Sequence, residues 1–256
     1  MAPLPPPPAP TSADHLLAEQ VARRAGELLV ELRAELAGRI DPWSLGDQGD
    51  RRSHDLIDGL LSAGAPGDAV LSEEGHDDPE RLAATRVWIV DPLDGTREFR
   101  EAGRTDWAVH VALAIGGAVV AGAVALPARQ LVLSTATPPA VPPAAGGRPR
   151  LVVSRSRPPE AALAVADALD GELVPLGSAG AKAMAVVLGE ADAYLHAGGQ
   201  YEWDNAAPAA VAQAAGLHVS QLDGRPLAYN KPDPWSPELL VCRPELAGPI
   251  LALTTR

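Results

Sequence analysis

Acidic residues in three separated stretches are the groups of this 256-residue chain that could do chemistry. The first stretch contains Glu73 and Glu74, the second contains Asp91 and Asp94, and the third contains Asp204. Two carboxylates three residues apart, with a turn between them, can point into one cavity and flank a pair of hard cations. Ligand sets made of oxygen atoms alone, with no nearby His or Cys, favour magnesium over zinc. The second stretch therefore predicts a magnesium site.

The elements around Asp91 suit a phosphate as well as a metal. Val87–Val90 is an uninterrupted apolar run that is typical of a strand buried on both faces, and Asp91 follows at its carboxyl end, where open sheets gather their ligand sites. Gly95 and Thr96 would then open a helix whose free N–H groups and dipole attract a phosphate. The alternative is that Asp91 and Asp94 only cap a turn and a helix.

A different kind of phosphatase competes with this reading. Leu93-Asp94-Gly95-Thr96 resembles the start of a haloacid-dehalogenase-type motif, which needs a nucleophilic Asp two residues before the second Asp. That position is Pro92, and the additional acid, Asp91, stands three residues upstream. A phospho-aspartyl intermediate is therefore disfavoured.

The net charge of −12 excludes some partners and raises a question about others. A nucleic-acid polymer calls for a basic face, so none is expected as a partner. A small phosphorylated substrate would also be repelled unless bound cations invert the local field. No apolar run reaches the roughly 20 residues of a membrane span, and the first ten residues lack a secretory pattern, so a cytoplasmic location is expected by default. The single cysteine, Cys242, is expected to be a buried structural thiol.

The elements that must position these acids predict a mixed α/β chain in two halves. Residues 1–10 form a proline-rich tail, residues 11–140 an N-terminal half with the metal motif, and residues 150–256 a C-terminal half with Asp204 and substrate contacts. Helices are predicted over 11–38, 50–64, 159–169, 181–188 and 204–215, and strands over 87–90, 107–115, 118–126, 131–134, 151–154 and 192–196. The whole reads as helices packed against two mixed sheets.

Together the acidic stretches resemble the three-part signature of the inositol monophosphatase superfamily. The signature consists of Glu73-Glu74, Asp91–Thr96 and Trp203–Ala207, and the agreement covers nearly the whole chain. Three further stretches are similar to the actinobacterial CysQ-like branch, namely Arg97–Phe99, Gly177–Lys182 and Asp192–His196. The resemblance implies a layered αβαβα sandwich and a magnesium-dependent, typically lithium-sensitive phosphatase. The narrower branch implies a 3′(2′),5′-bisphosphate nucleotidase, which converts 3′-phosphoadenosine 5′-phosphate to AMP.

The resemblance also implies a role for each acid. Of two or three magnesium ions, one would be held by Glu73, Asp91 and the backbone carbonyl of Leu93. A second would be held by Asp91, Asp94 and Asp204. The water that attacks phosphorus in line would be activated on the Glu73 side, so Glu73 also counts as catalytic.

Thr96 and Asp50 complete the catalytic residues that the resemblance implies. Thr96, supported by Asp50, would orient the attacking water and help to take its proton. The match upstream of Asp50 is poor, because Leu45-Gly46-Asp47 replaces the usual Pro-Val-Thr stretch. Asp50 is alternatively a plain helix N-cap. No covalent enzyme intermediate is expected.

Residues from both halves are expected to contact the substrate. The transferred phosphate would lie against Leu93, Asp94, Gly95, Thr96 and Asp204. Lys182, with Ser178 as a weaker partner, follows a turn that opens a helix, and this combination suits a second phosphate. The alternative for Lys182 is a solvated helix lysine. Trp203 either walls the sugar pocket or packs in the core, and Arg97 either attracts additional phosphate or pairs with Glu98.

Several functions fit these residues. A 3′-phosphoadenosine 5′-phosphate phosphatase is the leading hypothesis, and inositol-1-monophosphatase and fructose-1,6-bisphosphatase activities are rivals within the same chemistry. A non-catalytic nucleotide or metal sensor is the alternative of another class, although a sensor has no need of Thr96. Family habit suggests a homodimer.

Overall fold

The structure is a computed structural model that describes residues 9–255, so residues 1–8 of the predicted proline-rich tail lie outside the described part. In chain order, the helices are α1 (Ser12–Leu36), α2 (Pro42–Gly64), α3 (Thr96–Arg100), α4 (Glu160–Ala168), α5 (Ala179–Val187), α6 (Glu202–Ala214) and α7 (Pro244–Thr254). The strands are β1 (Ala69–Ser72), β2 (Arg86–Asp94), β3 (Ala108–Ile115), β4 (Ala118–Leu126), β5 (Leu131–Ser134), β6 (Arg150–Ser154), β7 (Glu172–Leu176), β8 (Ala193–Tyr201), β9 (His218–Ser220) and β10 (Trp235–Cys242). Two 3₁₀ helices, η1 (Pro79–Ala83) and η2 (Pro127–Arg129), lie between them.

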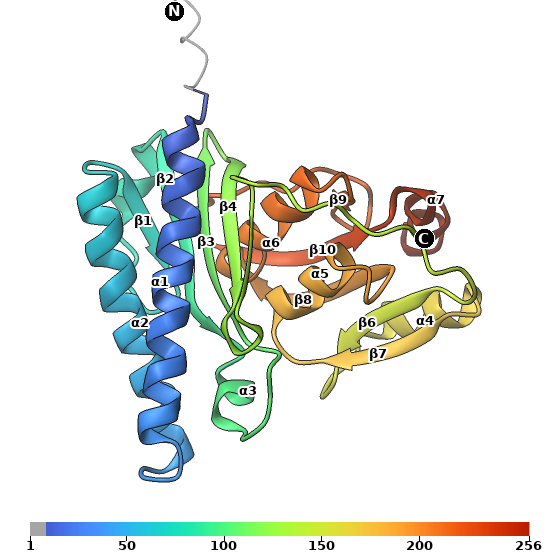
Figure 1. The fold of residues 1–256 in the computed structure, drawn as a ribbon. Helices are drawn as coiled ribbons and strands as arrows, with labels where there is room; N and C mark the ends of the chain where they lie inside the picture. The colour runs from blue at the N-terminus through green and yellow to red at the C-terminus, as the bar shows by residue number, and fades with distance from the viewer. Residues whose placement is uncertain (1–8, 256) are drawn as a thin grey trace, which may run out of the picture.

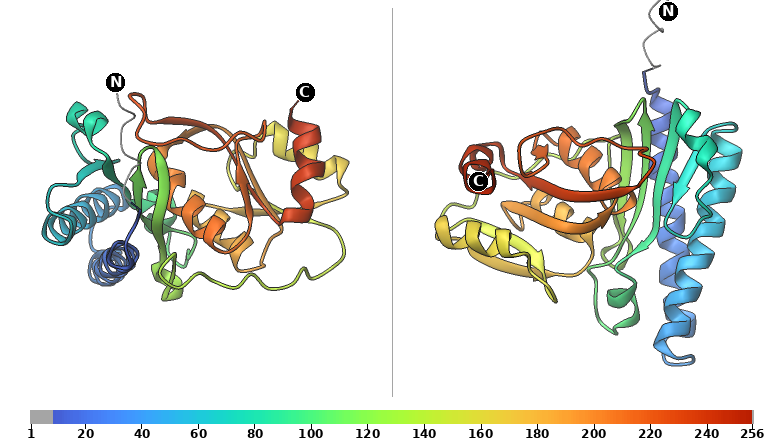
Figure 2. Two further views of the ribbon diagram at one scale, coloured as in Figure 1. Left: turned by 90° about the horizontal axis from the view of Figure 1, so that it is seen from above. Right: turned by 180° about the vertical axis from the view of Figure 1, so that it is seen from behind.

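These elements stack in five layers, as the resemblance implied (Figure 1). Helices α1 and α2 cover the outer face of the first sheet, and α5 and α6 lie between the two sheets (Figure 2). Helices α4 and α7 cover the far face of the second sheet. The predicted αβαβα sandwich of mixed α/β class is therefore confirmed.

The first sheet has the strand order β1-β2-β3-β4-β5, and only β1 and β2 are parallel. The predicted hairpin is present, because Gly116 and Gly117 join β3 to β4 with φ angles of 58° and 84° that favour glycine. Apolar side chains on the outer face pack against the first two helices, with Leu29, Ile57 and Trp88 fully buried.

The second sheet has the order β7-β6-β8-β10-β9, in which β7, β6 and β8 are parallel and β10 runs antiparallel to both of its neighbours. Cys242, at the end of β10, is fully buried, as the sequence predicted. The segment 135–149 joins the two sheets. The division into halves at 11–140 and 150–256 stays a prediction.

The start of α2 differs from its prediction. The sequence placed it near Asp50, but the helix begins at Pro42 with Asp41 as its N-cap, whose side chain accepts the Ser44 N–H at 3.0 Å. Asp-Pro at these positions is a strong helix start, since Pro at the first position has no N–H to leave unpaired. Asp50 is therefore inside the helix, and the alternative that it is an N-cap is wrong.

The layers bring distant segments to one place. Because β1 and β2 are parallel, their carboxyl ends meet at the same edge of the first sheet, with Ser72 opposite Val90. The N-termini of α5 and α6, the two helices between the sheets, point residues of the second half at this edge. Among residues 9–255, no helix combines the length and apolar character needed to cross a bilayer.

Candidate active site

The four acids that the sequence predicts as metal ligands lie together. One carboxylate oxygen from each of Asp91, Asp94 and Asp204 lies within 4.8 Å of the others. Glu73 follows β1 and its N–H donates to the Val90 carbonyl at 3.3 Å, so its carboxyl group reaches that of Asp91 as a hydrogen-bonding neighbour. The predicted convergence of these acids is present, and their function as ligands is taken up as a proposal below.

A bulge explains how two acids three residues apart share one cavity. The pairing of β2 with β3 is irregular between Asp91 and Asp94, which re-aims the second side chain. Inside the bulge, Asp91 Oδ1 accepts the Leu93 N–H at 3.0 Å. Ser53, on α2, donates its hydroxyl to the Pro92 carbonyl at 2.7 Å. The first layer of helices thus fixes the loop from behind.

Thr96 and Asp50 are in contact, as the resemblance implied. Thr96 Oγ1 lies 3.2 Å from Asp50 Oδ1 and 3.2 Å from the Leu93 carbonyl oxygen. Gly95 is the N-cap of α3 and has a φ of 85°, a left-handed conformation that a side chain would strain. The loop therefore holds the threonine hydroxyl between a carboxylate and a carbonyl.

Three acids of the site carry proton affinities far above normal. Burial, and then the Glu73 charge, raises the pKa of Asp91 well above its usual range. Burial and the Asp204 charge raise the pKa of Glu73 to about 7, although part of this side chain is open to the cavity. Burial and the Asp94 charge raise the pKa of Asp204 to about 6. The protein supplies too little positive charge on this side of the site to balance these groups.

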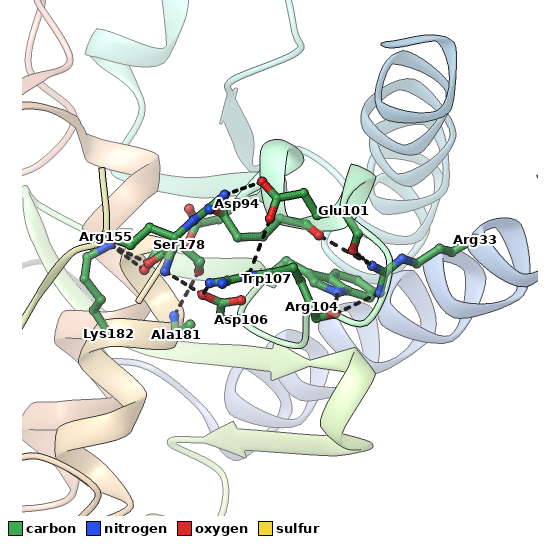
Figure 3. Close-up of polar contacts among 12 residues, drawn as sticks. Arg33, Asp94, Glu101, Arg104, Asp106, Trp107, Arg155, Ser178, Ala181 and Lys182 are labelled. Atoms are coloured by element: carbon green, nitrogen blue, oxygen red, sulfur yellow. Dashed lines mark hydrogen bonds and ion pairs between the residues drawn. The ribbon is translucent and has the colours of Figure 1, made fainter. Parts of the chain in front are cut away.

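Asp94 differs from its neighbours because it is surrounded by donors. Its Oδ1 accepts the Ala179 N–H at 3.1 Å and its Oδ2 accepts the Gly180 N–H at 2.7 Å. The Ser178 hydroxyl, labelled with Asp94 in Figure 3, donates to Oδ2 as well. Burial alone would raise the pKa of Asp94, but the adjacent His110 and these donors lower it to about 2. Asp94 is therefore a fixed anion.

The same contacts correct the expected function of the helix N-terminus at Lys182. The sequence predicted that N–H groups at the start of α5 bind a second phosphate. Two of them, those of Ala179 and Gly180, instead donate to Asp94. Lys182 is buried, and its Nζ donates to the carbonyls of Gly177 at 2.6 Å and Ser178 at 2.7 Å. The expectation of a solvated side chain is therefore wrong, and the N–H groups of this helix end are not free, while contact of Lys182 with a phosphate stays a prediction. Lys182 and Ser178 still line the cavity described below.

His110 is the residue of the site that sequence reasoning missed. It is fully buried, its Nδ1 lies 3.0 Å from the Trp203 carbonyl, and its Nε2 lies 3.2 Å from Asp94 Oδ2. Burial disfavours the charged ring, but the Asp94 carboxylate outweighs it and raises the pKa of His110. No histidine stands near the acids in the sequence, but the fold brings His110 to Asp94. The sequence signal for His110 was its position as the one ionisable residue in the otherwise apolar β3.

A cavity of about 830 Å³ lies between the two halves, and its lining combines acidic and cationic side chains. Its acidic lining residues are Glu73, Asp94, Asp204 and Glu98, and we call the first three, which lie with Asp91, its acidic end. Arg97 and Arg157, which we call its cationic end, line it together with Thr96, Arg155, Lys182, His196 and Gln200. The cavity is large enough for a nucleotide-sized ligand, since small-molecule sites span roughly 300–1,000 Å³.

The three arginines of the cavity differ in their partners. Arg155 is held by Glu98 at 2.6 Å and by Glu101 at 2.6 Å (Figure 3). Arg97 and Arg157 are exposed, and neither forms a salt bridge within residues 9–255. The alternative that Arg97 pairs with Glu98 is therefore wrong, because Glu98 is bound by Arg155.

Trp203 packs rather than lines the cavity. Its ring stacks on Tyr201 with ring centres 4.8 Å apart, and the side chain adjoins the central apolar cluster. Of the two readings offered by the sequence, core packing is the one that the structure supports.

The donor set suits a hard divalent cation. Four carboxyl groups offer oxygen atoms only, and three of them have raised pKa values that a bound cation would reverse. The Asp94 carboxylate raises the pKa of His110 against the effect of burial, which favours the charged ring, a form that cannot act as a metal ligand. The residues therefore fit a metal-dependent site.

Comparison with known proteins agrees with this site. The sequence model of the inositol monophosphatase family matches residues 15–138 and 150–250. The chain is 54% identical over 235 residues to a Mycobacterium tuberculosis protein named 3′-phosphoadenosine 5′-phosphate phosphatase, covering 89% of this chain and 87% of that one. It is 34% identical to the Escherichia coli 3′(2′),5′-bisphosphate nucleotidase CysQ, covering 82% and 92% of the two chains.

A solved structure agrees as well. CysQ from Bacteroides thetaiotaomicron, a bacterial member of the inositol monophosphatase family, superposes with a TM-score of 0.79 at 28% identity and covers 91% of this chain and 97% of its own. Both the sequence and the layered fold thus point to one group of proteins. The chain belongs to the inositol monophosphatase family, in which its CysQ-like relatives stand at 34% and 54% identity.

Proposed function

We propose that this protein is a magnesium-dependent phosphomonoesterase that removes the 3′-phosphate of 3′-phosphoadenosine 5′-phosphate and releases AMP. The observation that carries the proposal is the cavity with an acidic end and a cationic end, which suits a small molecule with two phosphates. The names of the relatives at 54% and 34% identity support the same substrate class.

The acidic end would hold the metal. Glu73, Asp91 and the Leu93 carbonyl would hold one ion, and Asp91, Asp94 and Asp204 would hold another; the clustering of these acids supports this assignment. A bound divalent cation supplies Lewis-acid stabilisation of the phosphoryl oxygens and lowers the pKa of a bound water. We propose that two or three ions bind during turnover.

Thr96 and Asp50 would handle the proton of the attacking water. The Thr96 hydroxyl, 3.2 Å from Asp50 Oδ1, can accept a hydrogen bond from water while it donates to the carboxylate. Burial and the nearby Glu74 charge raise the pKa of Asp50 to about 7, which suits a proton acceptor that works near neutral pH. The pair would thus orient the attacking water and take its proton.

The cationic end would bind the phosphate that stays on the product. Arg97 and Arg157 are exposed in the cavity and have no carboxylate partner within residues 9–255, so their guanidinium groups are free for an anion. This assignment moves the second phosphate from the helix N-terminus at Lys182 to the arginines of the cavity.

Phosphate release from a panel of substrates tests the proposal. Purified protein with magnesium is given 3′-phosphoadenosine 5′-phosphate, 3′-AMP, inositol 1-phosphate and fructose 1,6-bisphosphate, each with and without lithium. We expect the nucleotide bisphosphate to have the highest kcat/KM and lithium to inhibit. A preference for inositol 1-phosphate or fructose 1,6-bisphosphate would assign the rival activity, and binding without any release would favour the sensor hypothesis.

The cellular location and the assembly state are further predictions. A cytoplasmic location and a homodimer remain predictions from the sequence. Sedimentation of the purified protein, with and without magnesium, would decide the assembly state.

A further inference from the structure

Two carboxylates of the first half, Asp94 and Asp106, accept hydrogen bonds from one turn of the second half, residues 177–180. Gly177, Ser178, Ala179 and Gly180 offer four consecutive donors between β7 and α5. Three of these donors bind Asp94, as described above. The fourth, the Gly177 N–H, donates to Asp106 Oδ2 at 2.6 Å (Figure 3).

These two acids share a rigid base. Asp94 ends β2, and its partner in the register of β3 is Ala108, two residues after Asp106. Asp106 is buried, and Arg104 donates to the same oxygen, Oδ2, that accepts from the turn. Arg33 on α1 fixes the chain here, since its guanidinium donates to the Arg104 carbonyl at 2.9 Å.

The turn is held in a conformation that it would not adopt alone. Ser178 has a φ of 27°, which costs an L-residue roughly 1–3 kcal/mol and persists only when the surroundings enforce it. Gly177 packs closely on Glu98, and a Cβ there would lie 2.3 Å from Glu98 side-chain atoms. Lys182 donates to the carbonyls of Gly177 and Ser178. Asp106 accepts the Gly177 N–H.

We propose that Asp106 is a positioning residue for Asp94. By accepting the Gly177 N–H, Asp106 keeps the strained turn in place. The turn then orients the Asp94 carboxylate toward the proposed metal site. The inference rests on the proposed metal-dependent activity. Asp106 does not line the substrate cavity, so its effect reaches the reaction only through this turn.

The contacts predict how substitutions at Asp106 differ. Asp106→Ala leaves Gly177 N–H without its acceptor, and we expect kcat to fall and the half-saturating magnesium concentration to rise, each by about 10- to 100-fold, as for other partners that orient metal ligands. KM for the nucleotide bisphosphate stays within about threefold, because no substrate contact is lost. Asp106→Asn keeps a carbonyl oxygen where both donors converge, so it retains most of the activity.

A matched control separates the turn from the ion pair. Arg104→Met removes the salt bridge to Asp106 and leaves the Gly177 N–H bond intact, so we expect kcat and metal affinity within about twofold of wild type. The same four proteins are titrated with Mn²⁺ by calorimetry without substrate, which reports metal affinity independently of turnover. Far-UV circular dichroism and thermal unfolding confirm that each variant is folded at the assay temperature.

Each result of these measurements either supports or overturns the proposed role of Asp106. Weaker Mn²⁺ binding and lower kcat in Asp106→Ala, with recovery in Asp106→Asn, support the proposal. Wild-type Mn²⁺ binding in folded Asp106→Ala, or an equal loss in Arg104→Met, overturns it. If Asp106→Ala does not fold, Asp106→Ser, which is too short to reach Gly177 but can hold a water, is judged by the same criteria. If wild-type protein hydrolyses no phosphate, the proposed function fails, while the Mn²⁺ titrations still decide the role of Asp106.

Discussion

The two ends of the cavity solve opposite electrostatic problems. At the acidic end, Glu73, Asp91 and Asp204 have raised pKa values, because buried like charges face one another with too few donors. At the cationic end, Arg97 and Arg157 are exposed without carboxylate partners within residues 9–255. This division of charge would allow a chain of net charge −12 to bind a polyanion. Much of the negative charge near the substrate stands where divalent cations would neutralise it, and the remaining wall carries free positive charge.

Asp94 differs from the other carboxylates of the acidic end. Its negative charge is balanced by the turn at 178–180 and by His110, so the pKa is lowered to about 2 rather than raised. One proposed metal ligand is therefore aimed by the protein itself, while a bound cation would reverse the raised pKa values of the other three. The difference between the ends can be tested from the acidic side, from the cationic side and at the packing around them.

Asp91→Asn should have the largest effect, since it breaks the acidic end at the residue shared by both proposed ions. We expect turnover to fall by on the order of a thousandfold. The metal-free protein should unfold at a higher temperature than wild type, because one of the repelling buried charges is gone. The Leu93 N–H keeps its acceptor in the amide oxygen, so the loop stays in place. Phosphate release and thermal unfolding in a chelator check both halves of this prediction.

The matched control for that variant is Asp223→Asn, which changes an acid outside the cavity. It should leave turnover and the unfolding temperature as in wild type. Equal activity of Asp91→Asn and wild type would remove Asp91 from the metal site.

The pH dependence of stability should sharpen the contrast between the ends. Glu73 has a pKa of about 7 in the folded protein against 4.5 in the unfolded chain, and Asp50 about 7 against 3.8. Because the folded state then binds more protons, the free energy of unfolding falls as pH rises through this interval. In a chelator, we expect the unfolding temperature to drop by on the order of 5 °C between about pH 5 and about pH 8.

Magnesium should remove most of this slope, because a bound cation favours the deprotonated carboxylates. Asp94 acts in a separate window, since its lowered pKa gives stability that is lost only as the pH falls from 3.8 toward about 2. An equal slope with and without magnesium would mean that no cation binds the raised-pKa acids.

Arg157→Ala should break the cationic end and leave the acidic end intact. KM for 3′-phosphoadenosine 5′-phosphate should rise about tenfold, which corresponds to about 1.4 kcal/mol. KM for 3′-AMP, which lacks the second phosphate, should change by less than about twofold. Arg148→Ala is the matched control, because Arg148 is an exposed arginine outside this cavity. A similar rise in KM for both substrates would place the second phosphate elsewhere.

Trp203→Phe should have the smallest effect on catalysis. The ring stacks on Tyr201 and adjoins the core rather than the cavity, so kcat and KM should stay within about twofold. Stability should fall by about 1 kcal/mol through lost stacking and apolar contact. A selective loss of affinity for nucleotides, measured against inositol 1-phosphate, would return Trp203 to the substrate pocket.

Much of the fold was predictable because its signals are local. The capping pair Thr11 and Asp14, the apolar run before Asp91 and the Gly-Gly hairpin each state their structure within a few residues. Elements without such signals were missed. Strand β7 has a mixed burial pattern and contains Pro175, and β1 is only four residues long, so neither shows a clear alternation.

The sequence by itself determined which residues could bind a cation and attack a phosphate, because carboxylate type, spacing and the Asp-Pro-Leu-Asp-Gly-Thr stretch are written in the chain. Only the tertiary structure decided the state of each group. His110 comes to Asp94 by strand pairing, and Asp94 accepts the N–H groups of Ala179 and Gly180 that looked free for a phosphate. Charge and hydrogen bonding depend on neighbours in space, and packing of β3 and α5 against the metal loop chose those neighbours.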